Sequence, residues 1–162
     1  MQNRFKFRYL FDKKLYEVVL IDFKFNNIYL KIDDKYPLRT KFDDRKLVQC
    51  TGLKDKNGKL IYEGDIVKDL TYLHEVKYVC AFLPIFGGLG LISNQDLKDY
   101  EFCKKNWENF TINDKVRKLD NRFKLANQGN KLKCFNMNNL KMDNFEVVGN
   151  IYENPELLKD GE

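Results

Sequence analysis

The chain has 162 residues, of which 43% are hydrophobic and 14% aromatic, and its formal net charge is +5. This length and composition predict a folded globular protein with a single domain, and they exclude an intrinsically disordered chain. The 29 basic and 24 acidic residues are interleaved, which favours a mixed, solvated surface. A broad basic face for nucleic acid or for an acidic protein is the alternative.

Four widely spaced cysteines occur without a C-x-x-C pair, namely Cys50, Cys80, Cys103 and Cys134. Such thiols are typical of small buried side chains in a reducing compartment. The N-terminal segment MQNRFKFRYL lacks the apolar region of a signal peptide. The stretch closest to a membrane span, residues 79–92, is short and interrupted by proline and glycine. We therefore expect a cytoplasmic protein that does not enter a membrane.

The first part of the chain is predicted to form an antiparallel β meander. Residues 4–12 alternate between aromatic and mostly basic side chains, as a half-buried strand does. Residues 15–25 and 28–32 are expected as the second and third strands, with turns at 12–14 and 26–27.

Residues 33–45 are rich in charged and turn-forming residues, and they include Pro37, which interrupts a strand. We expect a connecting loop here, with a short helical turn near Asp43. From Leu47 the chain is predicted to be extended again.

A tight β structure is indicated by the stretch Gln49–Val67. Asn57-Gly58 lies between two segments that can form strands, and this dipeptide is the strongest short signal for a type I′ hairpin turn. Glu63-Gly64-Asp65 predicts a second turn before the apolar step Ile66-Val67. The stretch specifies turns and packing, and it contains no recognisable catalytic pattern.

The remainder of the chain is predicted to begin and end with strands. Residues 75–82 form a β-rich segment with Val76, Tyr78 and Cys80 on one face, and a glycine-rich turn follows at 87–90. A helix is expected from Ser93 to about Asn109, within a polar insert at residues 93–144. The chain then closes with a strand at 145–152 and a short helical turn that starts at Pro155.

These elements predict a mainly β fold at the margin of α+β. We expect coiled antiparallel sheets that form a small barrel-like core, with one or two short helices.

Two blocks resemble the motifs of the YopX family. Gln49–Val67, QCTGLKDKNGKLIYEGDIV, is similar to the family signature, and Glu146–Leu158, EVVGNIYENPELL, is similar to its closing motif. Phe7–Asp22 resembles the opening strand pair more weakly. Cys50 departs from the family pattern, which usually has an aromatic residue at this position.

The resemblance implies a phage or prophage protein with a mainly β architecture. A homo-oligomer and a monomer are both compatible with it. It brings no established activity that can be assigned to residues. The motif glycines are expected to serve turns. The residues expected in the core are Tyr62, Ile66, Val147 and Ile151.

No catalytic, cofactor or metal site is predicted. His74 is the sole histidine, and the cysteines lack the paired spacing of a zinc site. The run Gly87-Gly88-Leu89-Gly90 lacks the Gly-Lys-Ser/Thr ending of a P-loop. The acidic pairs Asp33-Asp34 and Asp43-Asp44 are expected to be solvated, since adjacent side chains on a strand point in opposite directions.

We therefore expect a protein that acts by binding and is not an enzyme. The leading hypothesis is a protein partner from the host or the phage, with inhibition of host defence or regulation suggested only by the family resemblance. The alternative is nucleic acid, bound by lysine and arginine with aromatic residues that stack on bases. The candidate contact residues for either partner are Lys54, Lys56, Lys59, Trp107, Phe110, Arg117, Lys118, Arg122 and Phe123. The apolar segment Leu83–Phe86 is either core or a contact surface.

Overall fold

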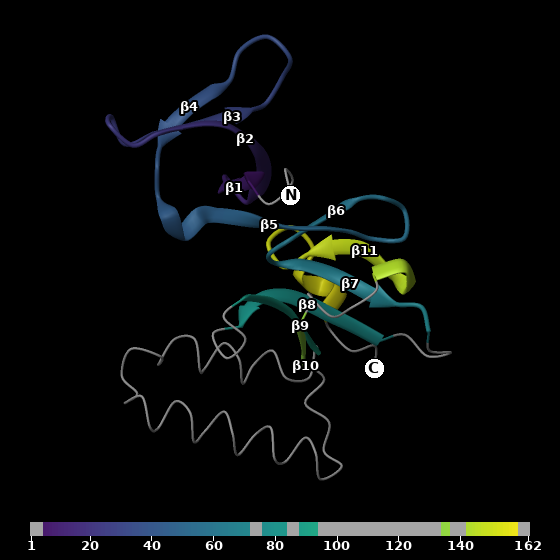
Figure 1. Cartoon of the computed structure of the whole chain (residues 1–162). Coiled ribbons are helices and arrows are strands. Elements are labelled where there is room, and N and C mark those ends of the chain that lie inside the picture. The colour runs from purple at the N-terminus through teal and green to yellow at the C-terminus, as the bar shows by residue number, and fades with distance from the viewer. Residues whose placement is uncertain (1–4, 72–75, 84–87, 94–133, 137–141, 159–162) are drawn as a thin grey trace, which may run out of the picture.

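A computed structural model describes residues 5–71, 76–83, 88–93, 134–136 and 142–158. The described strands form two antiparallel sheets (Figure 1). The strands are β1 (Phe7–Phe11), β2 (Lys14–Asp22), β3 (Asn27–Lys31), β4 (Leu38–Lys41), β5 (Leu47–Lys54), β6 (Leu60–Tyr62), β7 (Asp65–Asp69), β8 (Val76–Leu83), β9 (Gly88–Ser93), β10 (Cys134–Asn136) and β11 (Phe145–Asn150). Short 3₁₀ helices are η2 (Asp44–Lys46), η7 (Met142–Asn144) and η8 (Pro155–Leu158).

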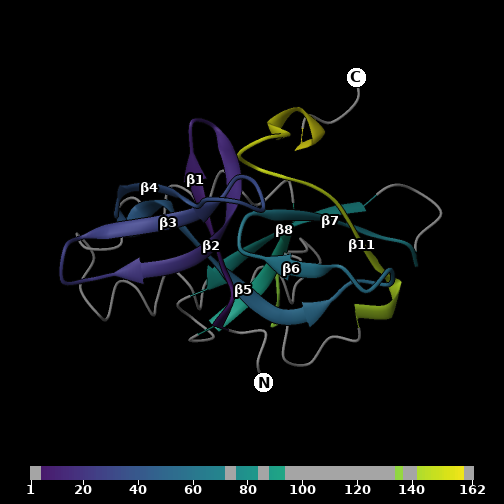
Figure 2. The same cartoon turned by 90° about the horizontal axis from the view of Figure 1, so that it is seen from above.

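The predicted mainly β class is confirmed. The first sheet has the strand order β4-β3-β2-β1-β5-β6, and the second has the order β10-β9-β8-β7-β11. Over the described ranges neither sheet closes on itself, so the sheets curve without forming a complete barrel. Figures 1 and 2 show β2, β3 and β4 extending to one side, away from the second sheet.

The predicted meander is confirmed as β1 to β4, with neighbouring strands paired in chain order. Asp12 and Lys13 join β1 to β2 with φ angles of 47° and 62°. Positive φ at both central residues defines a type I′ turn, whose twist matches that of the flanking strands. The helical turn expected near Asp43 is confirmed as η2, which Asp43 caps through its side chain.

The prediction of a loop throughout residues 33–45 was wrong, because β4 forms within it. Pro37 lies directly before β4, where its missing N–H removes no bond from the ladder. Leu38 and Thr40 alternate with the exposed Arg39 and Lys41, as expected for a short edge strand.

The hairpin expected at Asn57-Gly58 forms, but its turn is not of type I′. Gly58 has a φ of +79°, whereas Asn57 is absent from the residues with positive φ. The Gly58 N–H donates to the Asp55 carbonyl at 2.9 Å, and the Asp55 N–H donates to the Lys59 carbonyl at 2.9 Å. This pattern is a type I turn followed by a glycine in the left-handed region, the usual three-residue hairpin loop.

In the second sheet, the predicted strand at 75–82 is confirmed as β8, and the closing strand is confirmed as β11. The glycine-rich run was predicted to be a turn, but Gly88 and Gly90 lie within β9. Ser93, the expected helix N-cap, is the last residue of β9. The remainder of the predicted helix, residues 94–109, lies outside the described residues, as do Leu83's side chain and residues 84–86 of the apolar segment.

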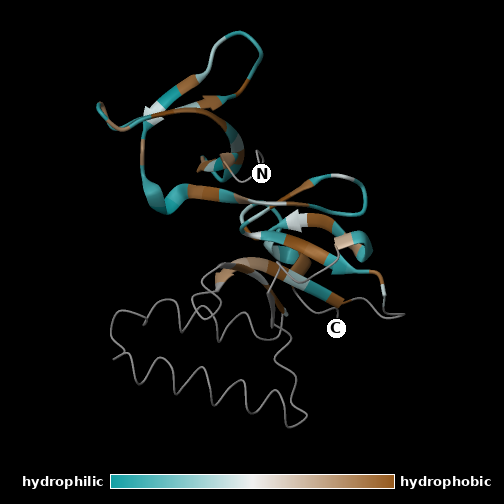
Figure 3. Ribbon diagram, in the orientation of Figure 1, coloured by the Kyte–Doolittle hydropathy of each residue, from teal (hydrophilic) through white to brown (hydrophobic). Residues whose placement is uncertain are grey.

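The main hydrophobic cluster belongs to the second sheet and the hairpin above it. Its fully buried members include Ile61, Val67, Tyr78, Cys80 and Leu91. The predicted insert at 93–144 contributes at its end, because β10 extends this sheet and Met142 is buried in the cluster. Hydrophobic strand segments occur in both sheets (Figure 3). Among the predicted core residues Tyr62, Ile66 and Val147 are buried, whereas Ile151 is half-buried.

Two smaller clusters belong to the first sheet. Tyr9, Ile28 and Leu30 line the inner face of the meander. On the opposite face, Val48 and Cys50 pack with Tyr62 and with the half-buried Leu15 and Tyr152. This second cluster joins the base of the meander to the C-terminal motif.

Candidate functional site

Three of the predicted contact residues, Lys54, Lys56 and Lys59, are exposed on the β5–β6 hairpin. The Lys56 ammonium lies 2.8 Å from the Glu146 carboxylate on β11. The hydrogen bond from Lys56 holds the pKa of Glu146 below its usual range. Lys56 is therefore engaged within the molecule, which leaves Lys54 and Lys59 as the freer cations of this set. The other predicted contacts lie outside the described residues: Trp107, Phe110, Arg117, Lys118, Arg122 and Phe123.

The hairpin is organised by the buried carboxylate of Asp55. Its Oδ1 accepts hydrogen bonds from the N–H groups of Asn57 and Lys59, both at 2.9 Å. Its Oδ2 accepts from the Val147 N–H on β11 at 3.0 Å. Burial acts to raise the Asp55 pKa, but these backbone donors together hold it below its usual range. Asp55 thereby fixes the turn and attaches it to the second sheet.

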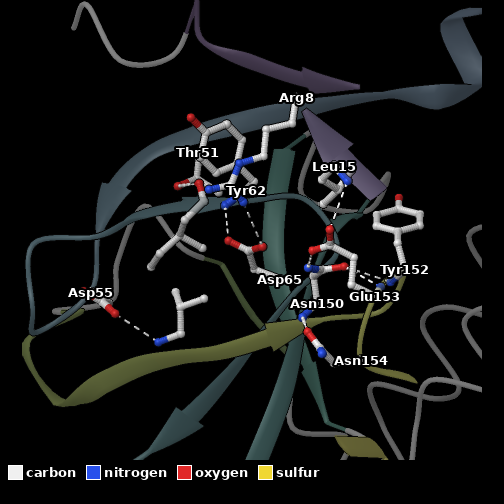
Figure 4. A network of polar contacts seen from close by, with 12 residues as sticks. Arg8, Leu15, Thr51, Asp55, Tyr62, Asp65, Asn150, Tyr152, Glu153 and Asn154 are labelled. Atoms are coloured by element: carbon white, nitrogen blue, oxygen red, sulfur yellow. Dashed lines mark hydrogen bonds and ion pairs between the residues drawn. The ribbon is translucent and has the colours of Figure 1, made fainter. Parts of the chain in front are cut away.

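A second buried acid, Asp65, joins β7 to the meander (Figure 4). Its Oδ2 accepts the Tyr62 N–H at 2.8 Å, and Nη1 of Arg8 lies 3.5 Å from its Oδ1. The Arg8 guanidinium also lies 3.9 Å from the centre of the Tyr62 ring. Burial raises the pKa of the Asp65 carboxyl to about 6, although the Tyr62 N–H and Arg8 act to lower it. The ion pair between Arg8 on β1 and Asp65 on β7 therefore connects the two sheets, whereas the contact of Arg8 with the Tyr62 ring on β6 lies within the first sheet.

The C-terminal motif is also attached to the meander. The Asn150 side-chain oxygen accepts from the N–H groups of Tyr152 and Glu153, at 3.0 and 2.9 Å. The Glu153 carboxylate accepts from the Asn150 amide at 2.6 Å and from the Leu15 N–H at 3.1 Å (Figure 4). The Asn150 and Glu153 side chains of this motif therefore serve a turn and a contact with the meander.

The buried thiol of Cys80 is not suited to nucleophilic chemistry. Burial raises its pKa well above the ordinary value, so the thiol is protonated at neutral pH. Cys50 and Cys80 are both buried, as expected for small core side chains. Within the segments described, no three His, Cys, Asp or Glu side chains gather closely enough to hold a metal ion. His74 lies outside these segments.

A different surface is open to solvent on the meander. We define the outer face as the side of β2, β3 and β4 opposite Ile28 and Leu30. The strand register places two rows of side chains there: Leu20, Tyr29 and Arg39 in one row, and Asp22, Asn27 and Lys41 in the next. An irregularity in the β2–β3 pairing lies between Val18 and Leu20, and both Val19 and Leu20 are more than half exposed.

The outer face is hollowed beside the β2–β3 turn. The hollow has a volume of about 660 Å³, and its walls come from Asp22, Phe25, Asn27, Tyr29, Arg39, Thr40 and Lys41. Lys41 Nζ lies 3.4 Å from the Phe25 carbonyl, and one Asp22 oxygen accepts the Phe25 N–H at 3.1 Å. These two bonds hold the turn against the sheet. The hollow therefore combines two aromatic rings with two cations and a carboxylate that is already bonded to the backbone.

Sequence reasoning missed this site. The signal was the alternation of Ile28 and Leu30 with Tyr29, which puts an aromatic ring on the face opposite the core. The alternation of Leu38 and Arg39 is the matching signal on β4, but it was assigned to a loop.

The described architecture is that of a two-sheet antiparallel β protein whose turns in Gln49–Val67 and Glu146–Leu158 serve packing, with an open face on its N-terminal meander. The family is shown by a match to the model described as "YopX protein", which spans residues 6–159. The chain belongs to the YopX family, and the resemblance seen in Gln49–Val67 and Glu146–Leu158 is confirmed.

Other comparisons are more limited. A search of the curated proteins found no match. Among solved structures, the chain is similar to the crystal structure of protein EF1440 from Enterococcus faecalis, with 24% identity and a TM-score of 0.44. The alignment covers 95% of this chain and 97% of that chain. None of the described helices is long and apolar enough to cross a membrane.

Proposed function

We propose that this YopX-family chain is a phage or prophage accessory protein that binds a protein partner in the host cytosol and is not an enzyme. The partner is a host or phage protein, and inhibition of host defence or regulation is one outcome of such binding. The alternative is that the surface which would bind this partner instead binds a second copy of the chain.

The observation that carries this proposal is the uneven placement of exposed hydrophobic side chains. Seven of the ten large ones found exposed in the described residues lie between residues 5 and 36, and they are 52–81% exposed. They are Phe5, Val19, Leu20, Phe23, Phe25, Ile32 and Tyr36. The other three, Leu70, Phe82 and Val148, are only 37–44% exposed. Solvent-exposed apolar residues concentrated in one region favour a contact surface.

The test is affinity capture from host lysate with a triple variant of the meander, Val19→Thr, Ile32→Thr and Tyr36→Thr. All three positions are exposed and none lines the hollow. Threonine preserves a β-branched side chain at Val19 and Ile32, and it removes apolar surface at all three positions. Leu70→Thr is the matched control, at the residue directly after β7 of the second sheet.

Wild type and the Leu70→Thr control are expected to retain the same discrete partner, and the triple variant is expected to lose it with an unchanged thermal transition. Equal capture by all three proteins would contradict the proposal. Light scattering on wild type and the triple variant separates self-association from a foreign partner, since a change in mass would assign the surface to a second copy of the chain.

Nucleic acid is the second candidate partner. The exposed Lys54 and Lys59 remain predicted contacts for it, and the specific observation that favours it is the hollow on the outer face.

A further inference from the structure

The hollow on the outer face is built from regular strand positions. Tyr29 lies directly opposite Arg39, and Asn27 lies directly opposite Lys41. Directly opposed side chains on one face have Cβ atoms about 5 Å apart, so each cation on β4 flanks one residue of β3. The inner side chains Ile28 and Leu30 are fully buried beneath them. The positions of the four outward residues are therefore set by the sheet and not by a loop.

The two cations face solvent without a described acidic partner. Neither Arg39 nor Lys41 takes part in the ion pairs found within the described segments, and both are exposed. Residues two apart along a strand are separated by about 6.7 Å, so the two charges form a short line along β4. Lys24 adds a third cation, with its ammonium 5.3 Å from the centre of the Phe25 ring.

Aromatic rings lie beside this line of charge. Tyr29 is half-buried at the centre of the outer face, and Phe25 is 60% exposed on the adjoining turn. Tyr29 and Phe25 both line the hollow. Asn27 supplies an amide that can donate and accept hydrogen bonds. The opposing charge is Asp22, and one of its oxygens is bonded to the Phe25 N–H.

We propose that this hollow binds a nucleoside phosphate, either as a unit of single-stranded nucleic acid or as a free nucleotide. The phosphate lies against Arg39 and Lys41, whose positive charge complements it, and the base stacks on Tyr29 or Phe25. Cationic grooves with aromatic platforms are the general means of binding single strands without sequence preference. This inference does not depend on the proposed protein partner.

An extended acidic peptide fits the same surface less well. Peptides of that kind commonly add a strand to a free sheet edge, and the free edge here is β4. Its four residues follow directly after Pro37 and end in Lys41. Short length, proline and exposed lysine all oppose the addition of another strand. The face of the sheet is therefore the available surface, and its chemistry suits a base and a phosphate.

The experiment is a fluorescence anisotropy titration of labelled oligo(dT), about fifteen nucleotides long, with the full chain across a salt series. Wild type is expected to bind, with affinity that falls as salt rises. Arg39→Ala and Lys41→Ala are each expected to lower the slope of log affinity against log salt by about 0.7, and the double variant by about 1.4. Lys35→Ala is the matched control, because it removes an exposed charge from the same meander but does not line the hollow.

Two further variants test the stacking. Tyr29→Ala is expected to weaken binding by roughly tenfold, whereas Tyr29→Phe retains the ring and is expected to bind like wild type. If Tyr29→Ala does not fold, the Arg39 and Lys41 variants still decide the matter. Competition with thymidine monophosphate separates the two ligand sources, because displacement at low nucleotide concentration assigns the hollow to free nucleotide.

No anisotropy change for wild type at low salt, with no binding of the mononucleotide, would overturn the proposal. The proposal would also be overturned if the double variant of Arg39 and Lys41 bound oligo(dT) like wild type. The same holds if Lys35→Ala lowered the affinity as much as the Arg39 and Lys41 variants do. If wild type has no affinity for oligo(dT) but binds a labelled acidic peptide, and the double variant of Arg39 and Lys41 does not bind that peptide, the hollow is assigned to a protein ligand instead.

Discussion

The N-terminal meander and the second sheet place their hydrophobic residues differently. In the second sheet, residues such as Val67, Tyr78 and Leu91 are buried in one cluster with Phe145 from the closing strand. The meander has only three fully buried residues in its own cluster. Its outer face is covered near Leu15, by Tyr62 and Tyr152, and is open further along β2.

This difference separates the part of the molecule that holds the fold from the part that is available for contacts. The family signature and closing motif are used in turns, in buried hydrogen bonds and in contacts between the sheets. On the outer face of the meander the described polar contacts are local, between Phe25 and both Asp22 and Lys41 and between Lys31 and Asp34. Changes in the two regions should therefore have different consequences.

The largest expected effect is on stability, from a cavity in the second sheet. Leu91 is fully buried, so Leu91→Ala is expected to lower the free energy of unfolding by about 2–5 kcal/mol. Leu20→Ala on the outer face, where the side chain is 54% exposed, is expected to change it by about 0.5 kcal/mol or less. Urea denaturation of both variants measures the contrast, and equal losses would remove the distinction between the two regions.

A second contrast lies within the signature, between its two turn glycines. Both have positive φ, +81° at Gly64 and +79° at Gly58. A Cβ at Gly64 would lie 2.6 Å from the Tyr152 ring, whereas one at Gly58 would meet nothing within 4 Å. Gly58→Ala is therefore expected to cost about 1–2 kcal/mol from backbone strain alone. Gly64→Ala is expected to cost about 2–4 kcal/mol, because the overpacking adds to the strain.

The same denaturation measurement compares the two glycine variants. A Gly64 variant no less stable than the Gly58 variant would show that the contact with Tyr152 does not hold the C-terminal motif in place.

The third contrast depends on pH and involves the contact between the sheets. The folded-state pKa of Asp65 is raised to about 6 from an ordinary 3.8, so the folded state favours the protonated carboxyl. Its contribution to stability is complete below about pH 4 and is lost as the pH rises through 6. Relative to Asp65→Asn, which does not titrate, wild type is expected to lose roughly 1–3 kcal/mol between pH 4 and pH 7.

Urea denaturation of wild type and Asp65→Asn at several pH values isolates this effect from other carboxyl groups. The contribution of Asp55 to stability depends on pH in the opposite direction, because its lowered pKa gives stability that is lost at acid pH. This contribution is present in both proteins and cancels in the comparison. A stability difference that does not vary with pH would show that Arg8 keeps Asp65 ionised throughout.

Much of the fold was predictable from local signals. The alternation in residues 4–12 and the closing strand at 145–152 follow the period of a half-buried strand, and the structure confirms both. The turn types were less predictable. Asp12 and Lys13 adopt the type I′ turn without a glycine, whereas Asn57-Gly58 does not adopt it. The Asp55 carboxylate accepts from two N–H groups within the turn and from the distant Val147 N–H, and side-chain bonds of this kind are not part of the Asn-Gly signal.

The outer face could not be predicted because it depends on register. Tyr29, Arg39 and Leu20 are separated along the chain and meet only when β2, β3 and β4 pair. The composition of the charged segment around Pro37 also favoured a loop. An edge strand of four residues has too little periodicity to indicate otherwise. The sequence motifs consequently pointed to the scaffold, and the open surface emerged only from the pairing of strands.

The central claim is that the meander makes the contacts while the signature holds the fold. Hydrogen–deuterium exchange of the chain with and without its captured partner tests it most directly. Binding is expected to slow exchange in residues 19–41 and to leave residues 60–69 unchanged. Protection confined to residues 60–69, with none in 19–41, would contradict the account.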